Sequence, residues 1–171
     1  MNEISTTQTP LGSHRDSLKG FTLIELMLVL GILVLLWAVA VPVYKEYKNR
    51  LLTSRTIADI ANFDAQIERY RSGHFGQLPD SLAQLAADTG VALPKDPWGK
   101  DYQYLKIEGV LPVLISNLIR VDKNLRPLNV DYDLFSMGPN KITLPAINVG
   151  PSLDDIVRAN SGSYIGVAND Y

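Results

Sequence analysis

The chain contains no cysteine, and this absence excludes disulfides, thiol nucleophiles and zinc sites built on thiolates. It has only two histidines, His14 and His74, and no paired-histidine metal motif. Neither sign of charge is in excess, because 16 basic and 18 acidic residues leave a net charge of −2. This balance provides no basic footprint for nucleic acid, and we expect no nucleic-acid partner.

Recognisable catalytic motifs are also missing. The sequence has no phosphate-binding loop, no dinucleotide fingerprint and no nucleophile elbow. His74 lies in a Gly-His-Phe-Gly stretch that is typical of a turn, so we interpret it as a loop residue rather than a general base. The sequence therefore predicts that the protein is not an enzyme.

The chain does have one long apolar run, from Phe21 to Val43, in which Glu25 is the only charged residue. As a helix rising about 1.5 Å per residue, the run would measure roughly 35 Å, enough to cross a bilayer core. A lone carboxylate inside hydrocarbon costs about 2.5 kcal/mol or more, so Glu25 needs a partner. Cleavage after Gly20 would create an amine on Phe21, four residues before Glu25. That amine, or the same amine on a neighbouring copy, is the best-placed cation.

Residues 19–26, Lys-Gly-Phe-Thr-Leu-Ile-Glu-Leu, lead into this run and resemble the processing and assembly signal of type IV pilins and type II secretion pseudopilins. The resemblance implies that residues 1–20 form a leader peptide that a prepilin peptidase removes by cutting between Gly20 and Phe21. It also implies that the peptidase methylates the new amine of Phe21. Glu25 is then the carboxylate that guides the docking of one subunit onto another.

Two other interpretations of the apolar run stay open. In an ordinary single-pass anchor, Glu25 would merely reach toward the membrane interface. A secretory signal peptide would have an apolar region of typically 7–15 residues followed by a cleavage site. Ala38 and Ala40 could mimic such a site, but Trp37 and residues 41–43 continue the run. We therefore favour the pilin-type signal.

Beyond Tyr44 the sequence becomes amphipathic, with one stripe that repeats at steps of three and four residues. The stripe consists of Thr56, Ile60, Phe63, Ile67 and Tyr70. The Ser-Gly-His triplet at 72–74 ends the pattern. We predict a single helix from Phe21 to Arg71, which Pro42 should kink or loosen by one turn because proline lacks an amide donor.

The chain is thus expected to have four parts. Residues 1–20 are the leader, and residues 21–43 span the membrane or form the core of a filament. Residues 44–72 form the amphipathic half of the helix. Residues 73–171 form a globular domain on which that half packs.

Inside this domain, the Leu-Pro-Asp-Ser stretch at 78–81 predicts the cap of a short helix. Leu82 and Leu85 would lie on one side of this helix, and Gly90 would end it.

Residues 102–106 and 130–135 alternate in the manner of strands. Residues 111–121 are apolar and β-branched enough for one more strand, broken by Pro112. The tail after Gly138 is rich in proline, asparagine, glycine and serine, and we expect it to be a long loop.

The second half extends the resemblance. Three segments, at 96–105 (DPWGKDYQYL), 132–138 (YDLFSMG) and 154–156 (DDI), are similar to the sheet of a major pseudopilin. The fold implied is α+β and pilin-like: a long N-terminal helix packed on a small antiparallel sheet, with a loop-rich C-terminal end. Many type IV pilins close this end with a disulfide, so the lack of cysteine and the Asp-Pro-Trp-Gly segment favour a pseudopilin.

Major pseudopilins bind calcium, and the resemblance places the ligands at Ser136, Asn140, Asp154 and Asp155. Two features depart from the family pattern: Asn140 replaces an acid, and a proline-rich, aliphatic stretch at 141–152 replaces a glycine-rich loop. Calcium prefers six to eight oxygen ligands. In the alternative interpretation, Asn140 is a turn residue and Asp154 caps a helix.

The function implied for a major pseudopilin is structural: a short periplasmic filament helps to push folded exoproteins through an outer-membrane channel. The implied partners are further copies of the chain in a helical homopolymer, the prepilin peptidase, minor pseudopilins, the inner-membrane assembly platform and the exoproteins. The implied location is a single pass through the inner membrane with the C-terminal domain in the periplasm. Lys45, Lys48 and Arg50 after the run favour the opposite orientation by the positive-inside rule.

The main alternative is a type IV pilin or minor pilin for adhesion, twitching or DNA uptake. A membrane-tethered enzyme or ligand-binding domain is a further alternative. It would need a clustered polar site, which the sequence does not reveal.

Overall fold

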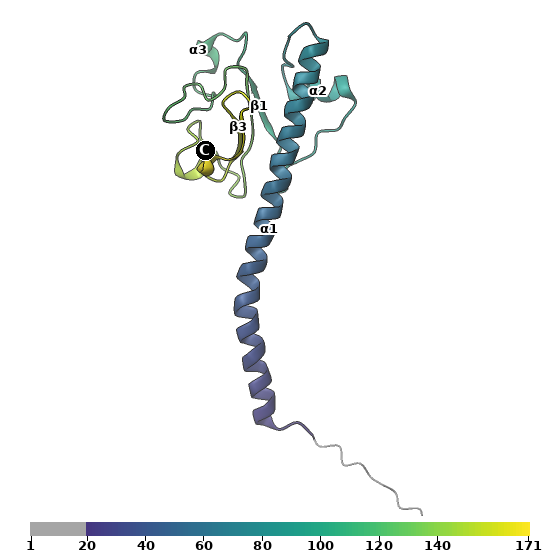
Figure 1. The fold of residues 1–171 in the computed structure, drawn as a ribbon, viewed down its shortest axis with the longest axis vertical. Coiled ribbons are helices and arrows are strands. Elements are labelled where there is room, and N and C mark those ends of the chain that lie inside the picture. Colours follow the sequence, from purple (N-terminus) through teal and green to yellow (C-terminus); the bar gives the residue numbers. More distant parts are fainter. Residues whose placement is uncertain (1–19) are drawn as a thin grey trace, which may run out of the picture. The chain divides into compact units, whose positions relative to one another are not determined.

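The structure is a computed structural model that describes residues 20–171, so the predicted leader lies outside the described residues except for Gly20. The fold is α+β and pilin-like, as predicted (Figure 1). Its helices are α1 (Leu23–Gly73), α2 (Leu82–Thr89) and α3 (Pro112–Ile115). Its strands are β1 (Gln103–Lys106), β2 (Tyr132–Ser136), β3 (Ile156–Ala159) and β4 (Tyr164–Val167).

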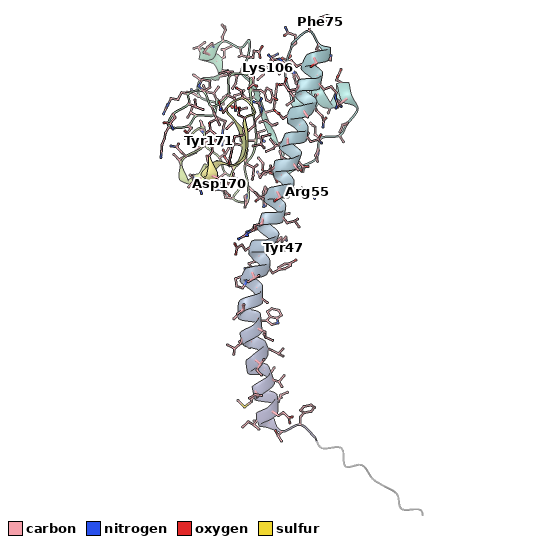
Figure 2. All side chains as sticks on the ribbon, viewed as in Figure 1. Tyr47, Arg55, Phe75, Lys106, Asp170 and Tyr171 are labelled. Carbon is pink, nitrogen blue, oxygen red and sulfur yellow. The ribbon has the colours of Figure 1, made fainter. Side chains whose placement is uncertain are left out.

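The long helix α1 runs without interruption through Pro42 for 51 residues. By length and composition, it is the one helix among the described residues that could span a membrane. Every residue from Gly20 to Leu51 is exposed, and Figure 2 shows the apolar side chains standing out all round the helix. From Leu23 to Val43 the helix is apolar on every side, and such a helix is not stable in water, so this part of α1 needs lipid or protein around it.

The C-terminal half of α1 has one buried face. Its buried residues are those of the predicted stripe: Thr56, Ile60, Phe63, Ile67 and Tyr70. The stripe packs against the sheet and α2 in one apolar core that includes Leu85, Tyr132, Leu134 and Ile156. Tertiary packing of this face holds the helix in place, because helical propensity alone contributes little.

Helix α2 begins and ends as the sequence predicted. The Ser81 hydroxyl accepts a hydrogen bond from the backbone amide of Gln84 at 3.2 Å and so caps the first turn. Gly90 ends the helix in the left-handed conformation, with φ of 69°.

The sheet is antiparallel throughout, in the order β1-β2-β3-β4. Strands β1 and β2 confirm the two predicted alternating segments. Because side chains alternate across a strand, Tyr132, Leu134 and Ile156 face α1, while Phe135 and Val157 join a second core on the other face. Leu128, Ile147, Ala159 and Ala168 complete that second core.

The predicted strand at 111–121 is wrong. The segment forms the short helix α3 followed by turns, and only Val121 makes a bridge, with Ala146. Pro112 is the reason: it has no amide to donate to a ladder, but its fixed φ suits the first position of a helix.

The expectation that the tail after Gly138 is one long loop is also wrong. Residues 156–159 and 164–167 form β3 and β4, a hairpin that continues the sheet from β2. Asn160, Ser161 and Gly162 all have positive φ in the connecting turn. The composition of the tail concealed two short strands, whose partners lie far away in the sequence.

Replacing Ile67, which is fully buried in the core, should test the importance of the stripe. We expect Ile67→Ala to lower the free energy of unfolding by about 2–5 kcal/mol, because it removes buried methyl groups and leaves a cavity. The matched control is Leu51→Ala on the exposed part of the same helix, for which we expect less than about 0.5 kcal/mol. Near-UV circular dichroism of the full chain in detergent during urea unfolding would measure both. Equal losses would contradict the assignment of the buried face.

Candidate functional site

The first functional region is the start of α1. Gly20 and Phe21 precede the helix, and Phe21 is 83% exposed. The amide of Glu25 donates to the Thr22 hydroxyl at 3.3 Å, and the amide of Thr22 donates to Glu25 Oε2 at 3.4 Å. This reciprocal pair is a capping box, which satisfies two amides that a helix start leaves free.

Glu25 therefore has a local role that our sequence analysis missed. The Thr-x-x-Glu spacing ahead of an apolar run was the signal that could have revealed it. The capping box holds the Glu25 carboxylate at the N-terminal end of α1, where the helix dipole favours an anion. The carboxylate belongs to the fourth residue after Phe21, the residue whose amine is expected to pair with it.

The second region joins α1 to the sheet through Arg158. Its side chain donates to Asp64 of α1, and it binds both oxygens of Asp131 at 2.8 and 2.7 Å. The guanidinium also lies 4.0 Å from the ring centroid of Tyr132, whose hydroxyl donates to Asp64 Oδ1 at 2.6 Å. Asp64 and Arg158 are 94 residues apart in sequence, so this cluster ties the helix to the C-terminal hairpin.

The charges of this cluster are mutually compensated. Burial disfavours the charged form of Asp131, but hydrogen bonds from Arg158 and from the Tyr132 amide outweigh it and lower the pKa of this carboxyl. The phenol of Tyr132 responds in the opposite direction, because burial and the Asp64 carboxylate raise its pKa far above the ordinary value. Arg158 and Asp131 therefore both stay charged at neutral pH.

The four predicted calcium ligands lie near the junction of β2 and β3, but each already has protein partners. The Ser136 hydroxyl donates to Asp96 Oδ2 at 2.7 Å and accepts from the Gly138 amide. The Asn140 side-chain amide donates to Asp154 Oδ1 and to the Pro151 carbonyl, and the Asn140 backbone amide donates to Asp154 Oδ2.

Gly138 makes this turn possible. A Cβ on Gly138 would lie 2.1 Å from the backbone oxygen of Asp154, and the residue has a φ of 65°. Only glycine fits here, and its close approach brings Asn140 onto the side chain of Asp154.

Asp155 is fully buried, and its Oδ2 accepts from the Arg120 guanidinium and from the Thr143 hydroxyl, both at 2.5 Å. Burial raises the pKa of the Asp155 carboxyl, while the bonds from Thr143 and Arg120 act against this rise. Among the described residues, no three histidine or acidic side chains converge on a common point.

These contacts do not fit a calcium ion. Asn140 presents its amide nitrogen, not its oxygen, to Asp154, and its oxygen accepts from the Ile142 amide at 2.7 Å. Asp155 already pairs with a cation, Arg120. Within residues 20–171, Asp155 Oδ1 and Arg120 Nε are both buried without a partner, and a metal ion beside them would suit the oxygen but repel the guanidinium. We therefore assign no chemistry to calcium here.

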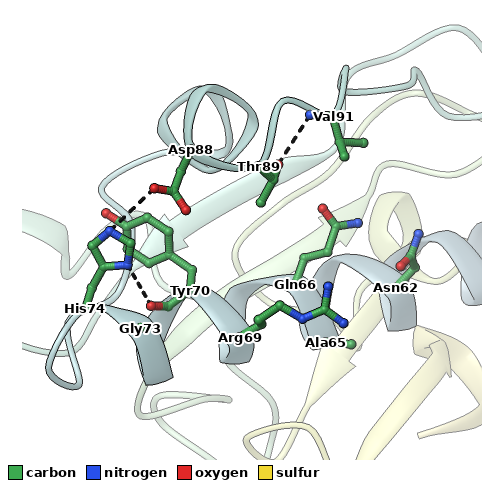
Figure 3. A pocket seen from close by; sticks show the side chains of 10 residues that line it. All are labelled: Asn62, Ala65, Gln66, Arg69, Tyr70, Gly73, His74, Asp88, Thr89 and Val91. Atoms are coloured by element: carbon green, nitrogen blue, oxygen red, sulfur yellow. Dashed lines mark hydrogen bonds and ion pairs between the residues drawn. The ribbon is translucent and has the colours of Figure 1, made fainter.

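A cavity of about 420 Å³ lies between the end of α1 and α2 (Figure 3). His74 stacks on Tyr70 at its rim, with ring centroids 3.8 Å apart, and its Nδ1 lies 2.9 Å from the Tyr70 carbonyl. Its Nε2 lies 3.5 Å from Asp88 of α2. Among the residues that the structure describes, no serine or threonine hydroxyl is hydrogen-bonded to this imidazole. His74 thus links α1 to α2 and has no activated nucleophile beside it.

Comparisons with known proteins agree with the fold. A type IV major pilin of Neisseria gonorrhoeae is 34% identical over 109 residues, which cover 63% of this chain and 58% of the pilin. A type II secretion system core protein G of Klebsiella michiganensis is 28% identical over 106 residues, which cover 53% of this chain and 75% of that protein. The core protein G of Pectobacterium carotovorum subsp. carotovorum is 28% identical over 114 residues.

These matches confirm the resemblance to type IV pilins and type II secretion pseudopilins. The chain spans less than two thirds of the gonococcal pilin, and both kinds of protein match it. These relatives are structural subunits rather than enzymes. No family model and no solved structure matches the chain.

The buried carboxyl of Asp133 yields a pH-dependent prediction. Burial raises its pKa from 3.8 to about 6, against hydrogen bonds from the Arg120 amide and the Asn129 side chain. Between these two pH values the folded state holds a proton that the unfolded state has released. Protonation of Asp133 therefore contributes up to about 3 kcal/mol to the free energy of unfolding. This contribution is complete below pH 3.8 and is lost as the pH rises through about 6.

Urea unfolding of the wild type and of Asp133→Asn, followed across this range of pH, would measure the effect. We expect the stability of the wild type to fall relative to that of the variant as the pH rises. A difference that does not change with pH would contradict the raised pKa.

Proposed function

We propose that this chain is a membrane-anchored structural subunit that is processed at Gly20–Phe21 and then assembles into a filament. The observation that carries the proposal is the part of α1 from Leu23 to Val43, which is apolar, exposed and charged only at Glu25. In the stored subunit, lipid covers this half. In the filament, the same half of neighbouring copies replaces the lipid and buries a similar apolar area.

The change of surroundings gives Glu25 its function. Prepilin peptidase creates the amine of Phe21, and the carboxylate of Glu25 on the adjoining copy pairs with it. Moving a charged group away from hydrocarbon and toward an opposite charge favours the assembled state. Because the pair forms at only one axial offset between helices, it also sets the register of the polymer.

At the finer level, we propose the major subunit of a type II secretion pseudopilus. Matches that cover 75% and 73% of two core proteins G support this assignment, as does the absence of cysteine. The filament would lie in the periplasm, grow from a single-pass inner-membrane store and help to drive folded proteins across the outer membrane. Minor pseudopilins, the assembly platform and exoproteins would be its partners.

A type IV pilin is the second candidate, and a specific observation favours it. The pilin match has the higher identity, 34%, and covers more of this chain, 63%. Deleting the gene in its native host would separate the two: a pseudopilin mutant accumulates exoproteins in the periplasm, whereas a pilin mutant loses surface filaments. Unchanged secretion with lost filaments would reject the pseudopilus assignment.

Processing is the most direct test of the proposal. We expect the protein isolated from its native membrane to begin at Phe21 and to carry a methyl group on that amine, as mass spectrometry of the N-terminal peptide would measure. Gly20→Leu should block cleavage, because the peptidase signal is lost while the apolar run is kept. Co-expression with the peptidase should change the gel mobility of the wild type, whereas the mobility of Gly20→Leu should stay the same with and without the peptidase. A native protein that still begins at or near Met1 would remove the basis of the proposal.

Two substitutions at Glu25 separate its two roles. Glu25→Gln keeps a side chain that can complete the capping box but removes the charge, whereas Glu25→Ala removes both. We expect both variants to insert into the membrane normally and to form no filaments, because the pairing with the Phe21 amine needs the charge. Sedimentation and electron microscopy of sheared filaments would measure this.

The matched control is Glu46→Gln, an exposed glutamate of the same helix that pairs only with Arg50 four residues away among the described residues. It should leave filament growth unchanged. Normal polymer from Glu25→Gln, together with failure of Glu25→Ala, would mean that capping alone explains Glu25.

A further inference from the structure

Arg120 is an unusual residue for a surface loop, because it is only 2% exposed although it lies between α3 and β2. Its backbone amide donates to Asp133 Oδ2 at 2.7 Å, and its backbone carbonyl accepts from the Leu128 amide at 2.7 Å. A charged side chain buried to this extent requires compensation within the protein.

The guanidinium finds that compensation in the C-terminal loops. One terminal nitrogen donates to the Thr143 hydroxyl and to the Leu144 carbonyl, and the other donates to Asp155 Oδ2. Thr143 completes a triangle by donating to the same oxygen of Asp155. The guanidinium carbon also lies 4.2 Å from the ring centroid of Phe135 on β2.

These contacts bring together three stretches that lie outside the strands of the sheet. Arg120 belongs to the segment before β2, Thr143 and Leu144 to the loop after β2, and Asp155 directly precedes β3. The residue after Arg120, Val121, forms the parallel bridge with Ala146. Two of these stretches, the loop after β2 and the residues just before β3, also contain ligands expected for calcium, and Asp155 is common to both sets.

We propose that the Arg120 guanidinium is the built-in cation of this C-terminal region, so that the domain is fully stable without a bound calcium ion. The acid that a calcium ion would use, Asp155, is neutralised from within the chain. The neighbouring acid, Asp154, is held by both amide groups of Asn140. This proposal concerns how the domain is stabilised and does not depend on the assembly proposed for α1.

The test is thermal melting of the full chain in detergent, monitored by near-UV circular dichroism, with calcium chloride or with a chelator. We expect the melting temperature of the wild type to be the same in both, within about 2 °C, which is the size of a marginal effect in a domain of this length. A saturable rise of several degrees with calcium, absent with magnesium, would overturn the proposal.

Variants of the Arg120–Asp155 pair provide a second test that does not require calcium. Arg120→Met removes the charge and leaves Asp155 buried without a cation, so we expect the melting temperature to fall by roughly 10 °C or more. Arg120→Met combined with Asp155→Asn removes both charges and should recover most of that loss. A double variant as unstable as the single one would show that the loss does not come from the unpaired acid.

The matched control is Arg126→Met, an exposed arginine of the same segment, which should melt within about 2 °C of the wild type. If Arg120→Met does not fold, the calcium comparison on the wild type still decides the proposal, since it needs no variant.

Discussion

The constraint on which the rest of this molecule depends is that α1 must satisfy two different surroundings along one uninterrupted helix. From Leu23 to Val43 its side chains are apolar on all sides and need lipid or other helices. From Thr56 to Tyr70 only one stripe is apolar, and the sheet covers it. The sequence of the helix itself therefore sets the boundary between the all-apolar part and the part with a single apolar stripe. The proposed storage in a membrane and assembly into a filament both follow from the first half.

The domain on the second half has no disulfide, and two buried arginines take over the linking of distant segments. Arg158 joins α1 to the C-terminal hairpin through Asp64 and Asp131, and Arg120 joins the loops around β2 to Asp155. A buried ion pair adds little net stability compared with a hydrophobic pair, but removing one partner is costly. Such clusters therefore select one arrangement of the loops, and they add little to the net stability of the domain.

Sequence reasoning succeeded where a local pattern determines the outcome. The stripe on α1, the Ser81 cap, the Gly90 stop and the strands β1 and β2 each depend on spacing or on a single residue type. It failed where long-range pairing outweighs composition. The proline- and glycine-rich tail hid the hairpin of β3 and β4. The apolar segment at 111–121 forms a helix and turns, because Pro112 favours a helix start. The strand that pairs with β1 is β2, which comes later in the sequence.

The sequence by itself therefore determined the apolar and amphipathic halves of α1 and the isolated acid at Glu25, because these depend on residue order along one element, while its resemblance to pilins and pseudopilins implied the α+β class. Only the tertiary structure decided the partners of the acids near the C-terminus. The resemblance pointed to a metal ion at Asp154 and Asp155, whereas the fold brings Asn140 to one and Arg120 to the other. Arg120 lies 35 residues before Asp155, and no periodicity links the two. Such a pairing exists only once the sheet and its loops have formed, since it is the burial of both charges that makes each require the other.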